Sequence, residues 1–417
     1  MVSRWSVLAA GTFAQASTAA HFLGLAAVTP DLRAHFGLGL AGVGALIGAI
    51  SVGIVTTLIA WGGLADRYGE RWVMTAGLAG AAVLLTVTGF VHDPVAAGAL
   101  LFLAGACGAS VNAASGRAVL TWFPGRQRGL AMAVRQTSVP IGAGLAALTL
   151  PAIAAHGGIA AVFAALGALC AVAAVTVAMV VREPPGYDAP TTAARGRAAS
   201  TGAGRRAGLR DVLTDRRLLR LSLAGALLVV PQFVGSTLLV EVLLAGGITA
   251  ATAGLLLAST QVLGAAGRLA NGWWSDRVGS RLGPLRIVAI LTAVGFGVAA
   301  LLQPGPGSVL AAVLVPAAAL AISWNGLVFT AAGELAPPGR AATAMAVSNT
   351  ANYVSAAATP ALGGLVAQVA GWPAGLALAG AAAAAAVLAL HRLAEPRTGF
   401  VTAVVPHRTD AGPHGTV

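Results

Sequence analysis

Long apolar runs, separated by short polar segments, dominate this chain. A helix needs about 20 apolar residues to cross the hydrocarbon layer of a membrane. Backbone groups in hydrocarbon must also bond internally, which favours helices. The pattern therefore predicts an all-α membrane protein with twelve transmembrane helices in two pseudo-symmetric six-helix bundles. The runs cover residues 5–28, 41–62, 72–91, 95–121, 129–154, 159–181, 221–244, 251–274, 285–302, 309–332, 341–369 and 374–390.

A polar stretch divides the runs into two sets of six. It covers residues 182–220 and is rich in Arg, Pro, Gly, Ala, Ser and Thr, a composition typical of a flexible linker. We therefore expect an N-terminal six-helix bundle over 1–181, a basic cytoplasmic linker over 182–220 and a C-terminal six-helix bundle over 221–394. Residues 395–417 have no apolar run long enough to cross a membrane and are expected to form a disordered cytoplasmic tail.

Composition supports a lipid environment. Hydrophobic residues make up 57% of the 417 residues and charged residues only 9%, whereas a soluble domain carries roughly 25% charged residues. The net charge of +12 could suggest a nucleic-acid partner, but the basic residues lie mostly in short loops between apolar runs. Membrane orientation explains that placement, so we expect the lipid bilayer and a small solute as partners, and no nucleic acid.

Orientation follows from the arginines, which supply all 25 basic residues. If the N-terminus is cytoplasmic, all but four of them lie in cytoplasmic segments. The exceptions are Arg33 outside and Arg117, Arg135 and Arg268 within runs. The positive-inside rule therefore predicts a multi-pass protein of the cell membrane with both termini in the cytoplasm.

The two halves also share a loop signature. Each carries Gly-x-x-x-Asp-Arg-x-Gly-x-Arg after its second run, at an offset of 210 residues. The copies are Gly62-Gly-Leu-Ala-Asp66-Arg67-Tyr-Gly69-Glu-Arg71 and Gly272-Trp-Trp-Ser-Asp276-Arg277-Val-Gly279-Ser-Arg281. A second match joins Ala-Met-Ala-Val at 131–134 to the same letters at 344–347, an offset of 213 residues. Two matches at nearly one offset indicate an internal duplication.

With this signature the chain resembles the major facilitator superfamily over essentially its whole length. Glu70 departs from the usual pattern, which has a basic residue there. The resemblance implies a secondary active transporter whose bundles rock around a central site, with the loop helping to lock one conformation. The loop chemistry agrees: glycine allows close helix approach and positive φ, and Asp66 and Asp276 can bond helix N-terminal amides or a nearby Arg.

Charged residues inside a bilayer are costly and are therefore candidates for function. Gln261, Arg268 and Asn271 share one face of the eighth run. The string around Arg268 resembles the monocarboxylate and oxalate/formate branch of the superfamily, in which the matching Arg binds substrate carboxylate. That resemblance implies a substrate-binding role for Arg268, and pairing with the cytoplasmic loop is the alternative.

Ser348 occupies the position of the second repeat that corresponds to Arg135 in the first. Internal symmetry therefore does not require a charge at position 135. We expect substrate binding, with an interhelical bond or polar gate as the alternative. Arg117 lies nearer the cytoplasmic end, and its expected role is a structural ion pair with Asp66, as in related transporters. Uncharged amides in the apolar runs are further candidates to line the cavity: Gln232, Asn349, Asn352, Asn112 and Asn325.

Proton coupling has two candidates. His21 lies in the first run, and an imidazole titrates near neutral pH, although the sequence favours a hydrogen-bonded packing role. Glu241 lies near the outer end of the seventh run and could instead simply reach water. Cys107 and Cys170 are isolated in apolar runs and form neither a disulfide framework nor a metal site.

Three functional readings stay open. The first is a transporter for a small organic anion such as a carboxylate, with proton symport. The second is an efflux antiporter for a neutral or amphipathic compound, and the third is a non-transporting sensor. The sequence has no P-loop, no Ser-His-Asp arrangement and no HExxH motif, so we expect no enzyme, no cofactor and no metal. A monomer is expected.

Overall fold

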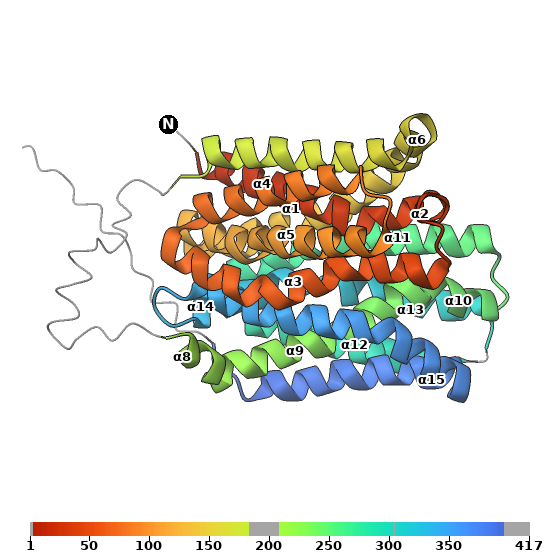
Figure 1. The fold of residues 1–417 in the computed structure, drawn as a ribbon. Coiled ribbons are helices and arrows are strands. Elements are labelled where there is room, and N and C mark those ends of the chain that lie inside the picture. The colour runs from red at the N-terminus through yellow and green to blue at the C-terminus, as the bar shows by residue number, and fades with distance from the viewer. Residues whose placement is uncertain (1–2, 183–207, 304, 396–417) are drawn as a thin grey trace, which may run out of the picture.

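The computed structural model describes residues 3–182, 208–303 and 305–395 (Figure 1). Every regular element within those ranges is a helix. The N-terminal helices, red to yellow in Figure 1, and the C-terminal helices, green to blue, form two groups that run alongside each other. Eight helices of the described part are long and apolar enough to cross a membrane.

The N-terminal group contains six spans because its last helix folds back on itself at Gly158. The elements are α1 (Arg4–Leu23), the 3-10 segment η1 (Gly24–Val28), α2 (Thr29–Phe36), α3 (Leu40–Tyr68), α4 (Glu70–Thr88), α5 (Pro94–Trp122) and α6 (Gly125–Val180). Gly158 has φ 66° and ψ −171°, which divides α6 into two antiparallel arms. These arms correspond to the fifth and sixth predicted runs.

The C-terminal group repeats this arrangement. Its elements are α8 (Leu209–Thr214), α9 (Arg216–Phe233), the π-helical segment η2 (Val234–Leu238), α10 (Leu239–Ala245), α11 (Ala250–Val278), α12 (Leu282–Leu301), α13 (Gly307–Ile322), α14 (Asn325–Leu335) and α15 (Ala341–His391). Gly371, with φ 82°, folds α15 back as Gly158 folds α6. Since α9 continues through η2 into α10, and α13 is followed directly by α14, the twelve predicted spans are all present.

Side chains just outside the helices fix several of their starts. Ser3 accepts a hydrogen bond from the amide of Ser6 at the start of α1. Asp93 caps α5 and is followed by Pro94, and Thr249 caps α11. These are N-cap residues whose side-chain oxygens satisfy amides that a helix leaves unpaired. Pro231, near the end of α9, precedes η2, as expected where a proline removes a helical hydrogen bond.

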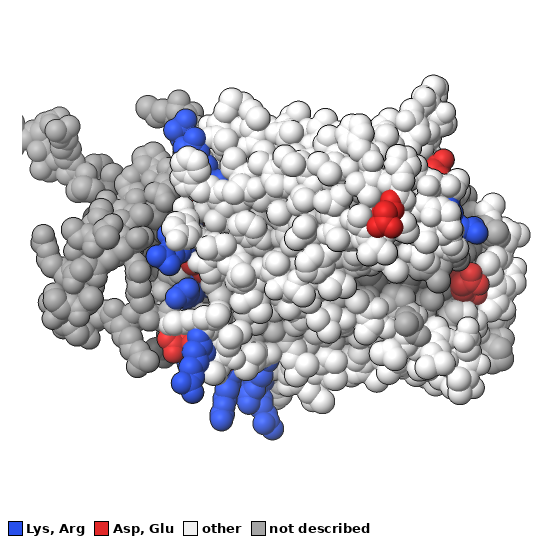
Figure 2. Space-filling view, in the orientation of Figure 1, with Lys and Arg blue, Asp and Glu red and all other residues white. Residues whose placement is uncertain are grey.

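The surface is charged at the ends and apolar between them. Arg side chains gather at one end, and a wide band of the face in Figure 2 carries no charge. We call the Arg-rich end of the molecule the loop end, because both signature loops and the N-terminus lie there (Figure 1). Large apolar side chains such as Leu148, Leu255 and Val369 are more than 70% exposed, as expected for surfaces that face lipid.

The structure adds detail at two predicted boundaries, those of the linker and of the C-terminal tail. The predicted linker, 182–220, contains α8 and the first turn of α9, which begins at Arg216, while residues 183–207 lie outside the described residues. The predicted tail begins at Glu395, yet this residue is held against the second signature loop. Its carboxylate accepts hydrogen bonds from the amides of Arg281, Leu282 and Gly283 at 3.2, 2.9 and 3.1 Å. Residues 396–417 lie outside the described residues.

Glu395 thereby caps α12 from a distant part of the chain. The Ser280 hydroxyl donates a further hydrogen bond to it. Arg286 reinforces the contact by donating to the carbonyl of Leu390 at 2.9 Å. A carboxylate at a helix N-terminus satisfies free amides and interacts favourably with the helix dipole. The end of α15 is therefore attached to the loop that begins α12.

Replacing Glu395 by Ala should destabilise the protein by about 1 kcal/mol, the usual cost of losing a helix cap. The measurement is the apparent melting temperature of the purified protein in detergent. Arg392→Gln is the matched control, since Arg392 is exposed and close in sequence. Equal melting temperatures for Glu395→Ala and the control would contradict a capping role.

Candidate functional site

At the loop end, Asp66 of α3 reaches across to the other bundle. Its carboxylate accepts hydrogen bonds from the amides of Ala342 and Thr343 at 3.0 and 2.9 Å. The Thr343 hydroxyl donates a third at 2.6 Å. These amides belong to the first turn of α15, where helical amides have no partner within the helix. Asp66 therefore caps a helix of the C-terminal bundle.

Asp276 of α11 does the same in the opposite direction. It accepts hydrogen bonds from the amides of Gly129 and Leu130, near the start of α6, at 2.9 and 2.8 Å. Gly129 and Leu130 are the repeat mates of Ala342 and Thr343 at the offset of 213 residues. The duplication thus produces two reciprocal contacts, and each bundle holds a helix end of the other.

Arginines neutralise both aspartates, but from different positions. Arg117 of α5 lies 3.6 Å from Asp66 and 2.7 Å from Glu70, so the residue that departs from the family pattern completes this cluster. In the second copy Arg281, from the loop itself, lies 2.7 Å from Asp276 and 3.3 Å from Glu334.

Arg281 links the two bundles. Its guanidinium also donates to the carbonyl of Gly125, at the start of α6. Burial lowers the pKa of Arg281, but the nearby carboxylates of Glu334 and Asp276 raise it by a larger amount. The pKa of Arg281 therefore lies above its usual value. A charged Arg281 therefore holds the second loop, α14 and α6 together.

Glycines bring the helix backbones together beside these caps. A Cβ atom on Gly272 would lie 2.5 Å from the carbonyl oxygen of Gly129, and one on Gly62 would lie 2.9 Å from the Cα of Thr343. Gly69 and Gly279 have φ of 86° and 64°, as expected for the reversals that follow α3 and α11.

The remaining signature arginines lie at the loop-end surface against aromatic rings. The guanidinium carbon of Arg67 is 5.1 Å from the ring centre of Tyr68, and that of Arg277 is 5.2 Å from Trp273. Arg71 donates to the carbonyl of Ala178 at 2.8 Å, within the N-terminal bundle. Arg71 and its repeat mate Arg281 therefore have different partners.

Gly272→Ala should separate the loop ends of the two bundles, because the new methyl group would collide with the α6 backbone. The measurement is the distance between spin labels at exposed positions 124 and 278, with Cys107 and Cys170 replaced by Ala. Gly254→Ala is the control, since nothing lies within 4 Å of a Cβ at that position of the same helix. An unchanged distance distribution in Gly272→Ala would contradict this packing role.

Five residues beyond Leu130 on α6, Arg135 lies in a polar network and is 3% exposed. It donates to the Ser115 hydroxyl at 2.8 Å, to the Gln136 side-chain oxygen at 2.7 Å and to the Asn112 carbonyl at 3.0 Å. Gln15 of α1 extends the network to the Asn112 side chain at 3.3 Å. All these partners are uncharged.

Arg268 of α11, 7% exposed, reaches the same region from the other bundle. It donates to the carbonyl of Gln136 at 2.7 Å and to the Asn325 side chain at 3.2 Å, and a third bond goes to the carbonyl of Ile322. Gln136 therefore joins the two arginines, with its side-chain oxygen on Arg135 and its backbone oxygen on Arg268. No carboxylate of the described residues lies within 4.0 Å of either guanidinium.

His21 lies beside this network and is fully buried. Its Nε2 atom has no hydrogen-bond partner in the described residues. The ring adjoins a cavity of about 20 Å³ that Gln15, Asn112 and Tyr353 also line, large enough for one water molecule. Tyr353 of α15 crosses the bundle interface, where its ring packs edge-on against Phe22 of α1 with the ring centres 5.7 Å apart.

The other candidates lie apart from the two arginines or lack contacts with them. Asn271 donates to the Ser323 hydroxyl at 2.9 Å, within the C-terminal bundle. Asn352 is buried against Gly225, and its side-chain atoms have no partner in the described part of the chain. Glu241 is exposed on α10. Gln232, Gln261 and Asn349 are half-buried, on α9, α11 and α15.

Sequence reasoning missed two members of the network, Ser115 and Gln136, and also Tyr353, which lines the cavity beside it. Ser115 follows Asn112 by three positions on one helix, a spacing that places both on one face and could have been recognised. Gln136 bonds Arg135 through its side chain, but its bond to Arg268 comes from the backbone carbonyl, which leaves no signal in a sequence.

Comparison with known proteins agrees with this architecture. The model of the Major Facilitator Superfamily matches residues 8–360 and 247–409. The chain belongs to the Major Facilitator Superfamily. An uncharacterised MFS-type transporter of Mycobacterium tuberculosis strain H37Rv is 35% identical over 389 residues, which is 92% of this chain and 84% of the relative. A counterpart in strain CDC 1551 gives the same values.

Solved structures of the superfamily share the fold. A proton:xylose symporter has a TM-score of 0.71 at 17% identity, covering 94% of this chain and 96% of the symporter. A human organic anion transporter scores 0.70 at 18% identity, covering 94% and 100%. A bacterial homologue of the iron transporter ferroportin, in an outward-facing state, scores 0.73 at 15% identity, covering 93% and 98%. The expected superfamily fold is therefore confirmed, and the protein is an MFS transporter.

Proposed function

We propose that this protein is a secondary active transporter whose central site, at Arg135 and Arg268, binds a small organic anion such as a carboxylate. The observation that carries the proposal is the pair of buried guanidinium groups, one from each bundle, whose hydrogen-bond partners are all uncharged. Two positive charges joined through one residue favour a negative ligand between them.

Electrostatics supports an anion over a neutral solute. A buried charge without a counter-ion is costly, and an anionic ligand reduces that cost on both sides of the interface. Arginine also presents a planar fork of donors that matches the two oxygens of a carboxylate. Asn325 and Ser115, which already bond these arginines, would line the same site.

The proposed orientation places the loop end, and with it both termini, in the cytoplasm. The gathering of Arg at that end (Figure 2) supports it through the positive-inside rule. We further propose a monomer in the cell membrane, with the bundles dividing within 182–220. The loop-end caps close that side, so this conformation would open to the outside.

We also propose His21 as the proton-coupling group, in preference to Glu241. The free Nε2 of His21 lies next to the Arg135 network, whereas Glu241 is exposed on α10. A proton on His21 would add positive charge close to the site, and an anion would offset it. Proton and anion would therefore bind with positive cooperativity, as symport requires.

The test of the anion site is uptake of labelled carboxylates into vesicles containing the purified protein, under an imposed pH gradient. Arg135→Ala and Arg268→Ala should each lower uptake by about 10- to 100-fold, since a hydrogen bond to a charged group is worth about 1.5–3 kcal/mol. Arg33→Gln is the control, because Arg33 is exposed on α2.

Thermal melting of each variant separates loss of the site from loss of the fold. Uptake that persists at the wild-type level in both arginine variants would rule out the proposed site. Resistance of cells to amphipathic compounds, without any carboxylate uptake, would instead support the efflux reading.

His21→Gln should abolish stimulation of uptake by the pH gradient while exchange of the anion across the membrane continues. Glutamine keeps hydrogen-bonding capacity but cannot carry the proton. The measurement compares gradient-driven uptake with counterflow in the same vesicles, and Glu241→Gln serves as the control. Stimulation that survives His21→Gln and disappears in Glu241→Gln would reverse the assignment.

A further inference from the structure

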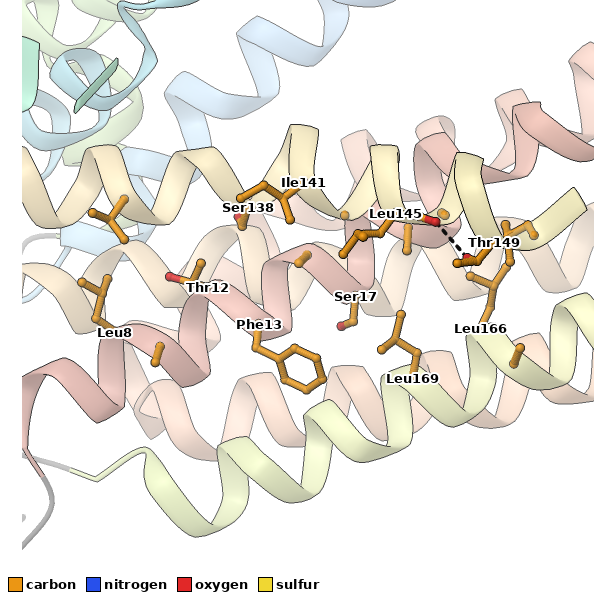
Figure 3. Close-up of a pocket in the computed structure, with 18 of the residues that line it drawn as sticks. Leu8, Thr12, Phe13, Ser17, Ser138, Ile141, Leu145, Thr149, Leu166 and Leu169 are labelled. Carbon is orange, nitrogen blue, oxygen red and sulfur yellow. Dashed lines mark hydrogen bonds between the residues drawn. The ribbon is translucent and has the colours of Figure 1, made fainter. Parts of the chain in front are cut away.

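A groove on the N-terminal bundle lies outside the central site. It has a volume of about 840 Å³ and runs between α1 and both arms of α6 (Figure 3). Leu8, Thr12 and Phe13 face it from α1, and Leu166 and Leu169 face it from the second arm. Along α1 it extends from Trp5 to Ala20, about 22 Å at 1.5 Å per residue.

The groove is apolar and opens on the side of the bundle. None of its lining residues is charged. The hydroxyls of Ser17 and Thr149 donate to carbonyls of their own helices at 2.7 and 2.8 Å, so they offer no free donor. Ile141 and Leu145 on its rim are 52% and 58% exposed, on a bundle that faces lipid.

Such a groove must be filled by something apolar. The cost of an empty apolar cavity rises with its volume, and water does not stably occupy a site that offers it no polar partners. In a membrane the neighbouring apolar molecules are lipid chains. Its elongated shape and its position beside α1 suit one acyl chain.

The loop-end mouth of the groove carries positive charge. Arg4 lies there, with its guanidinium carbon 5.7 Å from the ring centre of Trp5 and 5.8 Å from that of Phe123. The first turn of α1, at the same place, adds the partial positive charge of a helix N-terminus. A tryptophan at a groove mouth also suits the lipid headgroup level.

One polar atom in the groove lacks a partner. The hydroxyl oxygen of Thr12 is buried and makes no hydrogen bond within the described residues. Thr12 lies two turns beyond Trp5, about 10 Å deeper along the helix.

We propose that this groove is a binding site for an anionic phospholipid, with one acyl chain between α1 and α6 and the phosphate at Arg4. Charge complementarity selects the headgroup, and the shape of the groove holds the chain. The site is separate from Arg268 and does not depend on which solute the central site carries.

The test uses full-length protein in a mild detergent, mixed with equal amounts of phosphatidylglycerol and phosphatidylcholine, and counts retained lipids by native mass spectrometry. The wild type should keep one phosphatidylglycerol. Ala9→Phe, which fills the groove from α1, should reduce retention more than about tenfold, because each excluded methylene weakens binding. Ala168→Phe is the control, since Ala168 is exposed on the second arm of α6 but does not line the groove.

A second variant tests the headgroup and leaves the groove intact. Arg4→Gln should still retain a lipid but lose about fivefold in its preference for phosphatidylglycerol, the effect of one basic residue at a membrane surface. Arg33→Gln, at the opposite end, should keep the preference. Equal retention of both lipids by the wild type would overturn the proposal, and so would retention unchanged in Ala9→Phe. Loss of transport in Ala9→Phe with lipid retention unchanged would assign the groove to the solute instead.

Discussion

The two aspartate caps that cross between the bundles determine how the rest of the molecule is held. Asp66 accepts hydrogen bonds from first-turn amides of α15, and Asp276 accepts them from the amides of Gly129 and Leu130 near the start of α6. Each aspartate lies beside glycines that allow backbone contact. Breaking one cap exposes a carboxylate and free amides together, which is costly away from water. The loop end can therefore open only where water enters as the helices separate.

The asymmetry around these caps is informative. The aspartates and the amides they bind obey the repeat, but the neutralising arginines do not, since Arg117 comes from α5 and Arg281 from the loop. Glu70 pairs with Arg117, whereas the equivalent Ser280 bonds Glu395 from the end of α15. In both halves the aspartate binds backbone amides of the other bundle, but the arginine that neutralises it comes from a different position in each half. Hydrogen bonds between backbone and carboxylate are preserved, and side-chain pairs diverge.

The sequence was sufficient to predict the spans, the repeat and the fold, because apolar length and glycine placement act locally. It also brought Asp66 and Arg117 together through family resemblance. It did not predict that Arg268 would bond the carbonyl of Gln136, since every residue has such a carbonyl. Nor did it indicate that Glu395 would be held by α12, because a tertiary contact across more than a hundred residues has no periodic pattern. Asn271 and Asn352 contact residues of their own bundle, and their place in a cavity stays a prediction.

The bond from Arg268 to Gln136 has a thermodynamic consequence for the working cycle. It is a contact between bundles and at the same time occupies a donor that a ligand would need. In the proposed site, ligand binding and this contact between the bundles would thus compete for one guanidinium. By linkage, whatever free energy the ligand loses to that competition is the free energy by which it loosens the interface. The affinity for the ligand and the mobility of the bundles would then both depend on the same exchange of hydrogen-bond partners at Arg268.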